Sequence, residues 1–284
     1  MLFIFIAAIF SVTVSVLLKF YKNNELDIFQ ILAFNYIVAS SLSYLWFKPN
    51  FNLLDASSPW WLIIIMAILL PLVFWFLHQS LRYAGLIKTE IAQRISVVIT
   101  ILISALIYQE QFSGLKVVGI GLGFLAVIFM VTGKSAEQGH IVKSKWVWGS
   151  LLSVWLGYAV IDLMFKYLST QGMQFSVSLT LIFIFAALLT IGWNFLKKTQ
   201  WNKKSIAAGA LLGVLNFSNI AFYLYAHKLL KDSPAIVFAS MNILVVVFGI
   251  VAAIVFFKEK LNSSKIFGAA LAIIAVYCLM QSMV

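Results

Sequence analysis

The sequence has few of the residues on which disulfide-stabilised folds and soluble enzymes depend. It holds one cysteine, Cys278, so a disulfide within the chain and a cysteine-based metal site are excluded. Charged residues make up 10% of the chain, whereas a soluble domain carries about a quarter. No H-E-x-x-H motif and no phosphate-binding G-x-x-x-x-G-K-[ST] loop occurs. We therefore expect neither an enzyme nor a cofactor, and no ATP hydrolysis by the chain itself.

Hydrophobic residues take the place of the missing charges and make up 63% of the chain. That share exceeds what the core of a soluble protein of this size could bury. The net charge of +11 would be compatible with binding to nucleic acid, but the basic residues occur singly between apolar runs rather than on one face of the protein. Basic loops beside membrane spans explain the charge better, so the expected partner is the lipid bilayer and not nucleic acid.

Ten apolar runs predict an all-α integral membrane protein, since a spanning helix needs roughly 20 apolar residues. The first run has no basic start and no small-residue cleavage site after it, so we interpret it as a span rather than a signal peptide. The expected spans are residues 2–18, 28–47, 60–81, 91–108, 115–131, 146–167, 175–196, 206–226, 234–257 and 266–283.

Two stretches of the chain repeat with their rare polar residues in register. Shifting the first by 149 positions places His78 on His227, Gln93 on Asn242 and Glu110 on Glu259 without a gap. Each half holds five spans, and an odd number makes the second half enter the membrane from the opposite side. The prediction is an inverted repeat of two five-helix halves, residues 1–133 and 146–284, joined by a loop at 134–145.

Short motifs follow the spans of each half. The first half carries Ser-Leu-Arg-Tyr at 80–83 and Gln-Glu-Gln-Phe at 109–112, and the second half echoes them at 227–231 and 258–261. Glycines follow in the next span, at Gly119, Gly121, Gly123 and Gly268. With the ten spans, this pattern resembles the EamA-type branch of the drug/metabolite transporter superfamily. The resemblance implies ten helices in two bundles around a central cavity, and transport of substrates that vary widely within the family. The family usually has a proline near the start of spans four and nine, where this chain has Val97 and Val246.

Polar residues inside spans are costly and mark candidate function. Gln93 and Asn242 take equivalent positions in the two halves, where inverted-repeat carriers place their sites, so both are expected to bind substrate. Arg94 would favour a carboxylate or phosphate through bidentate contact. Alternatively, Glu90 pairs with Arg94 one turn on and holds the helix in place, or Arg94 extends to the membrane surface.

The remaining candidates lie on other helices or are titratable. Four side chains are expected to shape the substrate cavity, with core packing and interhelical hydrogen bonds as the alternatives: Trp75, Tyr158, Asn219 and Tyr223. Four are candidates for proton coupling, with ion pairing and packing at helix ends as the alternatives: Asp162, Glu90, His78 and His227. We interpret Glu110 and Glu259 as charges at helix ends rather than as a proton path.

The sequence favours a secondary-active transporter of a small metabolite, an amino acid or similar carboxylate-bearing compound, working by alternating access. The alternatives are an exporter of drugs or lipid-like compounds on the same fold, and a channel, for which no filter pattern occurs. The expected location is the bacterial cytoplasmic membrane, as a multi-pass monomer or homodimer. The positive-inside rule places both termini outside the cytoplasm, whereas the resemblance implies cytoplasmic termini.

Overall fold

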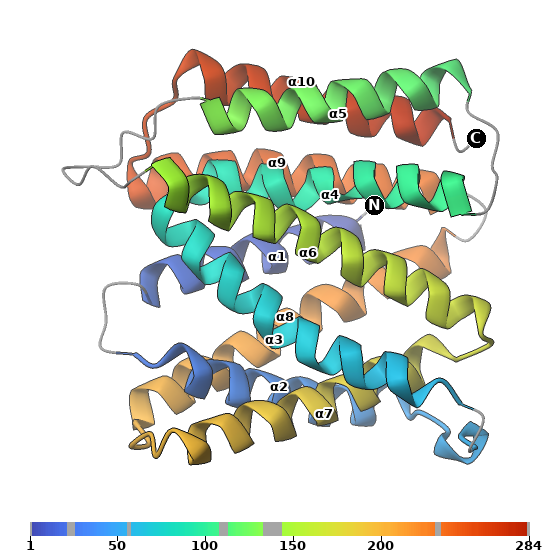
Figure 1. Ribbon diagram of the computed structural model, residues 1–284, viewed down its shortest axis with the longest axis vertical. Helices are drawn as coiled ribbons and strands as arrows, with labels where there is room; N and C mark the ends of the chain where they lie inside the picture. Colours follow the sequence, from blue (N-terminus) through green and yellow to red (C-terminus); the bar gives the residue numbers. More distant parts are fainter. Residues whose placement is uncertain are drawn as a thin grey trace. The chain divides into compact units, whose positions relative to one another are not determined.

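The computed structural model describes residues 2–21, 26–55, 58–107, 113–132, 144–230 and 234–282. These residues form ten α-helices of 19 to 27 residues, drawn in Figure 1, and one short 3-10 helix, Phe51–Leu53. The helices are α1 (Leu2–Phe20), α2 (Ile28–Phe47), α3 (Trp60–Tyr83), α4 (Leu86–Ile107), α5 (Gly114–Thr132), α6 (Ser144–Thr170), α7 (Phe175–Leu196), α8 (Lys203–Leu229), α9 (Pro234–Phe257) and α10 (Ser263–Gln281).

Eight of the helices in the described ranges are long and apolar enough to cross a membrane. The two others are α4, which carries Lys88, Glu90 and Arg94, and α5, which contributes a shorter apolar stretch, Gly114–Ala126. The prediction of an all-α, multi-pass membrane protein is confirmed, while the membrane crossing of α4 and α5 stays a prediction. The predicted loop at 134–145 lies almost wholly outside the described residues.

Helix α4 starts five residues before the apolar span predicted at 91–108. The apolar run suggested a helix from residue 91, but α4 begins at Leu86 and includes Lys88 and Glu90 in its first turns. Both side chains are buried, with exposed fractions of 0% and 1%. A hydropathy pattern excludes such residues from a span, because it assumes that they face lipid or water rather than other protein groups.

The chain divides into two compact units, and each takes segments from both predicted halves. Unit 1 comprises Met1–Lys19, Phe76–Ala159 and Asn219–Val284, and unit 2 comprises Phe20–Trp75 and Val160–Ser218. Helices α3, α6 and α8 run from one unit into the other, so each contributes one part to each unit.

Unit 1 is built on two helix pairs. Helix α5 lies along α10 and α4 lies along α9, as Figure 1 shows, and α4 also contacts α5 and α10. The first pair packs closely at Gly119, where an added Cβ atom would lie 2.8 Å from the Leu279 side chain. At Gly121, in contrast, nothing lies within 4 Å of an added Cβ atom. Small residues let helix backbones approach where lipid supplies no hydrophobic driving force.

Unit 2 is built on α2 and α7, which lie side by side in Figure 1. The Ser43 and Thr180 hydroxyl groups are 2.6 Å apart across this pair. Helix α8 approaches α2 at Gly213, where an added Cβ atom would lie 2.6 Å from the Asn35 carbonyl oxygen. The Asn216 amide donates to the Asn35 side chain at 3.4 Å, so this asparagine serves helix packing within unit 2.

Candidate functional site

Glu259 lies in the short loop between α9 and α10, where the backbone turns sharply. Lys258 adopts a left-handed conformation with φ of 50°, and the N–H of Glu259 donates to the Ala253 carbonyl at 3.1 Å. A positive φ is uncommon for a residue other than glycine. The turn brings a carboxylate of unit 1 inside the protein, where the residue is 8% exposed.

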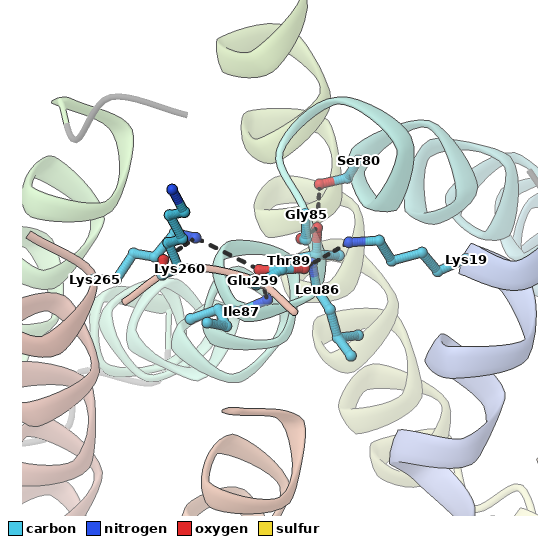
Figure 2. Close-up of polar contacts among 9 residues, drawn as sticks. All are labelled: Lys19, Ser80, Gly85, Leu86, Ile87, Thr89, Glu259, Lys260 and Lys265. Atoms are coloured by element: carbon cyan, nitrogen blue, oxygen red, sulfur yellow. Dashed lines mark hydrogen bonds and ion pairs between the residues drawn. The ribbon is translucent and has the colours of Figure 1, made fainter. Parts of the chain in front are cut away.

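Two buried lysines neutralise this carboxylate. Lys19, at the end of α1, places its Nζ atom 2.6 Å from Glu259 Oε1, and Lys265 of α10 places its Nζ atom 3.6 Å from Oε2. Figure 2 shows the three side chains converging, and we call them the Glu259 cluster. Lys19 also lies over the Phe257 ring at 4.6 Å. A buried charge is tolerated when it is paired and hydrogen-bonded, as it is here.

The same carboxylate caps the start of α4. The backbone N–H groups of Leu86 and Ile87 donate to its two oxygens at 2.6 and 3.4 Å (Figure 2). The first N–H groups of a helix have no partner within it, and a negative charge is stabilised at that end. Gly85 precedes them with φ of 88°, and an added Cβ atom would lie 3.0 Å from Glu259 Oε1. This position therefore favours glycine for two reasons: the backbone has a positive φ, and a side chain would crowd the Glu259 carboxylate.

A hydroxyl pair joins α3 to the same helix start. Ser80 and Thr89 are both buried, and their hydroxyl oxygens lie 2.8 Å apart (Figure 2). The Thr89 hydroxyl also donates to the Gly85 carbonyl at 2.7 Å. The end of α1, the end of α3, the start of α4 and the loop after α9 are thus held together by polar contacts within unit 1.

Opposing effects act on the Glu259 carboxyl group. Burial raises its pKa, but the charge of Lys19 and its hydrogen bond, the Leu86 N–H and the charge of Lys265 lower it by more. The pKa of Glu259 therefore lies below its ordinary value, and the carboxylate is charged at neutral pH. A group fixed in this state is suited to holding helix ends together.

A second polar group lies deeper along α1 and α4. The Arg94 guanidinium donates through Nη2 to the Ser11 hydroxyl at 2.7 Å, which joins α4 to α1. One turn toward the start of α4, the Glu90 carboxyl group lies near the Ser15 hydroxyl without completing a hydrogen bond to it. Gln93 immediately precedes Arg94 in the sequence of α4. We call Ser11, Ser15, Glu90, Gln93 and Arg94 the Glu90 cluster.

The Glu90 cluster contains buried polar atoms without hydrogen-bond partners in the described part of the chain. They are both carboxylate oxygens of Glu90, Nε2 of Gln93 and Nε of Arg94. Glu90 is 1% exposed and Gln93 is 7% exposed. Helix α9 packs closely against Glu90, since a Cβ atom added at Gly249 would lie 2.8 Å from Glu90 Cγ. Unsatisfied buried polar atoms are expensive, so a helix that carries four of them within five residues calls for a functional explanation.

The predicted pairing of Glu90 with Arg94 does not form a hydrogen bond. Arg94 turns to Ser11, and both Glu90 oxygens lack partners among the described residues. The predicted partner of Gln93 is also engaged elsewhere: the Asn242 amide donates to the Phe238 carbonyl of its own helix at 2.8 Å. Asn242 is nevertheless buried on α9, the helix that packs against α4, so its role in substrate binding stays a prediction.

The candidates on α8 lie in unit 1. The Tyr223 and His227 rings meet edge to face with centroids 4.7 Å apart, which favours packing as the role of His227. Asn219 is partly buried, and its Oδ1 atom has no hydrogen-bond partner among the described residues. His78 of α3 and Tyr158 of α6 belong to the same unit and are also partly buried.

The structure assigns two candidates to the other unit. Trp75 is partly buried and Asp162 is exposed, and both belong to unit 2. Trp155 of α6, in unit 1, is 9% exposed and donates to the Ile95 carbonyl at 3.1 Å, so it packs against α4. No group of three His, Cys, Asp or Glu side chains in the described ranges could hold a metal ion.

Sequence reasoning missed the Glu259 cluster and both serines of α1. Glu259 was interpreted as a helix-end charge, which is right for its place in the chain but overlooks its burial and its four partners. One signal was available: Glu259 stands in register with Glu110 in the repeat. Glu110 itself lies outside the described residues. Ser11 and Ser15 gave no signal, because serine is common in apolar helices.

Comparison with known proteins settles the family. The model of the EamA-like transporter family matches residues 1–132 and 145–281, which is almost the entire chain. The chain belongs to the EamA-like transporter family. It is also 36% identical over 281 residues to an uncharacterised protein of Haemophilus influenzae, covering 96% of this chain and 95% of that protein. Its EamA-like membership makes it a multi-pass integral membrane protein of a family of transporters, not enzymes.

A solved crystal structure shares the fold. It superposes with a TM-score of 0.62 over 99% of this chain and 97% of the other, at 14% sequence identity. At that identity the likeness shows a shared fold alone.

Proposed function

We propose that the protein is a secondary-active carrier of a small carboxylate-bearing metabolite, with an amino acid as the favoured substrate, in a bacterial cytoplasmic membrane. One observation carries the proposal: a guanidinium group, Arg94, held inside unit 1 by the Ser11 hydroxyl, with its Nε–H unused among the described residues. Guanidinium groups bind carboxylates through two parallel hydrogen bonds, and a charge in a transporter helix commonly marks the substrate path.

The helix pairs support alternating access by two inverted halves. Helix α4 packs on α9, α5 on α10 and α2 on α7, and each pair joins segments at equivalent places in the predicted halves, residues 1–133 and 146–284. Inverted-repeat carriers place their sites where the halves meet. The α4–α9 pair carries Gln93, Arg94 and Asn242, which we propose as substrate contacts. Tyr158, Asn219 and Tyr223 of unit 1 would shape the remainder of the path there, while Trp75 stays a separate candidate within unit 2.

Proton coupling is part of the same proposal. Asp162, His78 and His227 are the titratable side chains proposed to exchange the coupling proton, because each is at least partly accessible. Replacing each in turn and measuring uptake against an imposed pH gradient tests the assignment. The coupling residue should lose the dependence on the gradient while keeping counterflow, in which no net proton movement is needed.

Counterflow in proteoliposomes tests the carrier proposal. Purified protein is reconstituted, loaded with an unlabelled amino acid, and supplied with the same compound in labelled form outside. A carrier gives saturable, transient accumulation of label. Arg94→Ala should reduce this at least tenfold, while the exposed Arg82→Ala serves as the matched control and should not. Unitary currents would indicate a channel, and accumulation of apolar drugs alone would favour the exporter.

A further inference from the structure

Helices α1 and α4 meet in three successive polar contacts spaced by one helical turn. Lys19 and the N–H of Leu86 share Glu259 Oε1 at 2.6 Å each. Ser15 lies near Glu90 one turn inward, and Ser11 accepts from Arg94 one turn beyond that. From one contact to the next, the residue number decreases by four on α1 and increases by four on α4. The two helices therefore run antiparallel where they meet. At 1.5 Å per residue, Glu90 and Arg94 lie about 6 and 12 Å from the first contact.

The second and third contacts contain an acidic and a basic side chain, Glu90 and Arg94, whose hydrogen-bonding atoms are not all used. The Glu90 carboxylate can accept from several donors, and the Arg94 Nε–H can donate, yet neither has such a partner in the described ranges. On the same stretch of α4, one residue before Arg94, Gln93 Nε2 is another buried donor without a partner among the described residues. A ligand that satisfies these atoms must carry a cationic donor for Glu90 and an anionic acceptor for Arg94 and Gln93.

The spacing limits how far apart the two charges of the ligand lie. Side chains one turn apart on a helix have Cβ atoms about 5–6 Å apart. An ammonium group and a carboxylate on the same carbon fit between such neighbours without a long spacer. A ligand with only one charge would satisfy one of the two side chains and leave the buried hydrogen-bonding atoms of the other unused, which is costly.

We infer that the Glu90 cluster is a headgroup site for a zwitterion, with Glu90 and the Ser15 hydroxyl receiving an α-ammonium group and Arg94 and Gln93 receiving the adjacent carboxylate. This inference rests on the proposed carrier function and sharpens it. The substrate class becomes α-amino acids rather than carboxylates in general. Glu90 then acts as a specificity residue, and the coupling proton is carried elsewhere.

The first test uses the wild-type protein and needs no variant. The melting temperature in detergent is measured with each common L-amino acid, since a ligand of the native state raises stability. The best ligand is then compared with its deaminated acid, its decarboxylated amine and an isomer with a longer charge separation, as β-alanine is for alanine. We expect the amino acid to bind about 10- to 100-fold tighter than each analogue. Equal binding of the deaminated acid, or binding of no amino acid, would overturn the inference.

Variants separate the two charges. Glu90→Gln should weaken amino acid binding about 10- to 100-fold while binding of the deaminated acid stays unchanged or improves. Arg94→Ala should weaken both. The exposed Asp55→Asn removes a carboxylate from unit 2 and is the control that should change neither. Equal loss of both ligands in Glu90→Gln would indicate a structural role and would overturn the inference. If that variant does not fold, the wild-type comparison still decides.

The two proposals fail in different ways. Saturable counterflow of plain carboxylates by the wild-type protein, with no preference for amino acids, would overturn the headgroup site and leave the carrier standing. The absence of counterflow for every probe would overturn the carrier function itself.

Discussion

Two buried glutamates of unit 1, Glu259 and Glu90, have opposite surroundings, although they lie near α1 residues only one helical turn apart, Lys19 and Ser15. Glu259 meets two lysine ammonium groups and two backbone N–H groups. Glu90 is the more deeply buried, at 1% against 8% exposed, and both of its oxygens lack hydrogen-bond partners among the described residues. Burial alone therefore does not show what a charged residue in a membrane protein does.

The difference separates stability from binding. A buried carboxylate whose partners are supplied by the protein is costly to remove, because its partners are then left buried and unpaired. A carboxylate left without partners raises the free energy of the folded state, and proteins retain such groups mainly where a ligand or a proton completes them. We assign the Glu259 cluster to holding helix ends together and the Glu90 cluster to the substrate. The predictions below test this division, beginning with the largest expected effect.

Removing the charge of Glu259 should have the largest effect on stability. Glu259→Gln leaves Lys19 buried without its carboxylate and weakens the cap of α4, so we expect a loss of about 3–5 kcal/mol in unfolding free energy. Chemical denaturation in detergent measures it. Lys19→Met should be similarly destabilising, and the double variant should cost less than the sum of the two. Strict additivity would show that the two charges do not interact.

Gly85→Ala should have the next largest effect. The added methyl group would lie 3.0 Å from Glu259 Oε1. The alanine would also have to adopt the φ of 88° that Gly85 has, a conformation that costs a residue other than glycine about 1–3 kcal/mol. We expect a melting temperature below that of the wild type. Gly121→Ala is the matched control, because nothing lies within 4 Å of its added Cβ atom. Equal stability of the two variants would contradict the close approach at Gly85.

Acid should weaken the same cluster. The pKa of Glu259 is lower in the folded than in the unfolded protein, where it is about 4.3. Its stabilisation is therefore complete above the unfolded value and is lost as pH falls through the folded value, by at most about 1.4 kcal/mol per pH unit. Unfolding free energies of the wild type and Glu259→Gln should differ by a constant amount at neutral pH and converge in acid. A difference that persists unchanged in acid would contradict the ion pairs.

Glu90→Gln should have the smallest effect on stability. The Glu90 carboxyl group has no hydrogen bond to lose among the described residues, and the uncharged amide of glutamine has nearly the same size and shape. We expect a melting temperature equal to or above that of the wild type. A fall as large as that of Glu259→Gln would show that Glu90 is a structural residue.

The sequence was sufficient for the helices and for the family, because long apolar runs and short motifs depend only on local composition. It identified Arg94, Glu90 and Gln93 as candidates, since polar residues in an apolar run are visible without a structure. It could not identify Ser11, Ser15 or Lys19, whose importance comes from packing against residues far along the chain. The start of α4 was missed for the same reason, because its partner, Glu259, lies 173 positions away.

The most direct test measures melting temperature and amino acid affinity in Glu90→Gln and Glu259→Gln prepared side by side. We expect Glu259→Gln to lower the melting temperature and to leave the affinity of the folded protein near that of the wild type. We expect Glu90→Gln to lower the affinity about 10- to 100-fold and to leave the melting temperature unchanged or raised. Loss of stability without loss of affinity in Glu90→Gln, or the reverse in Glu259→Gln, would contradict the division between the two clusters.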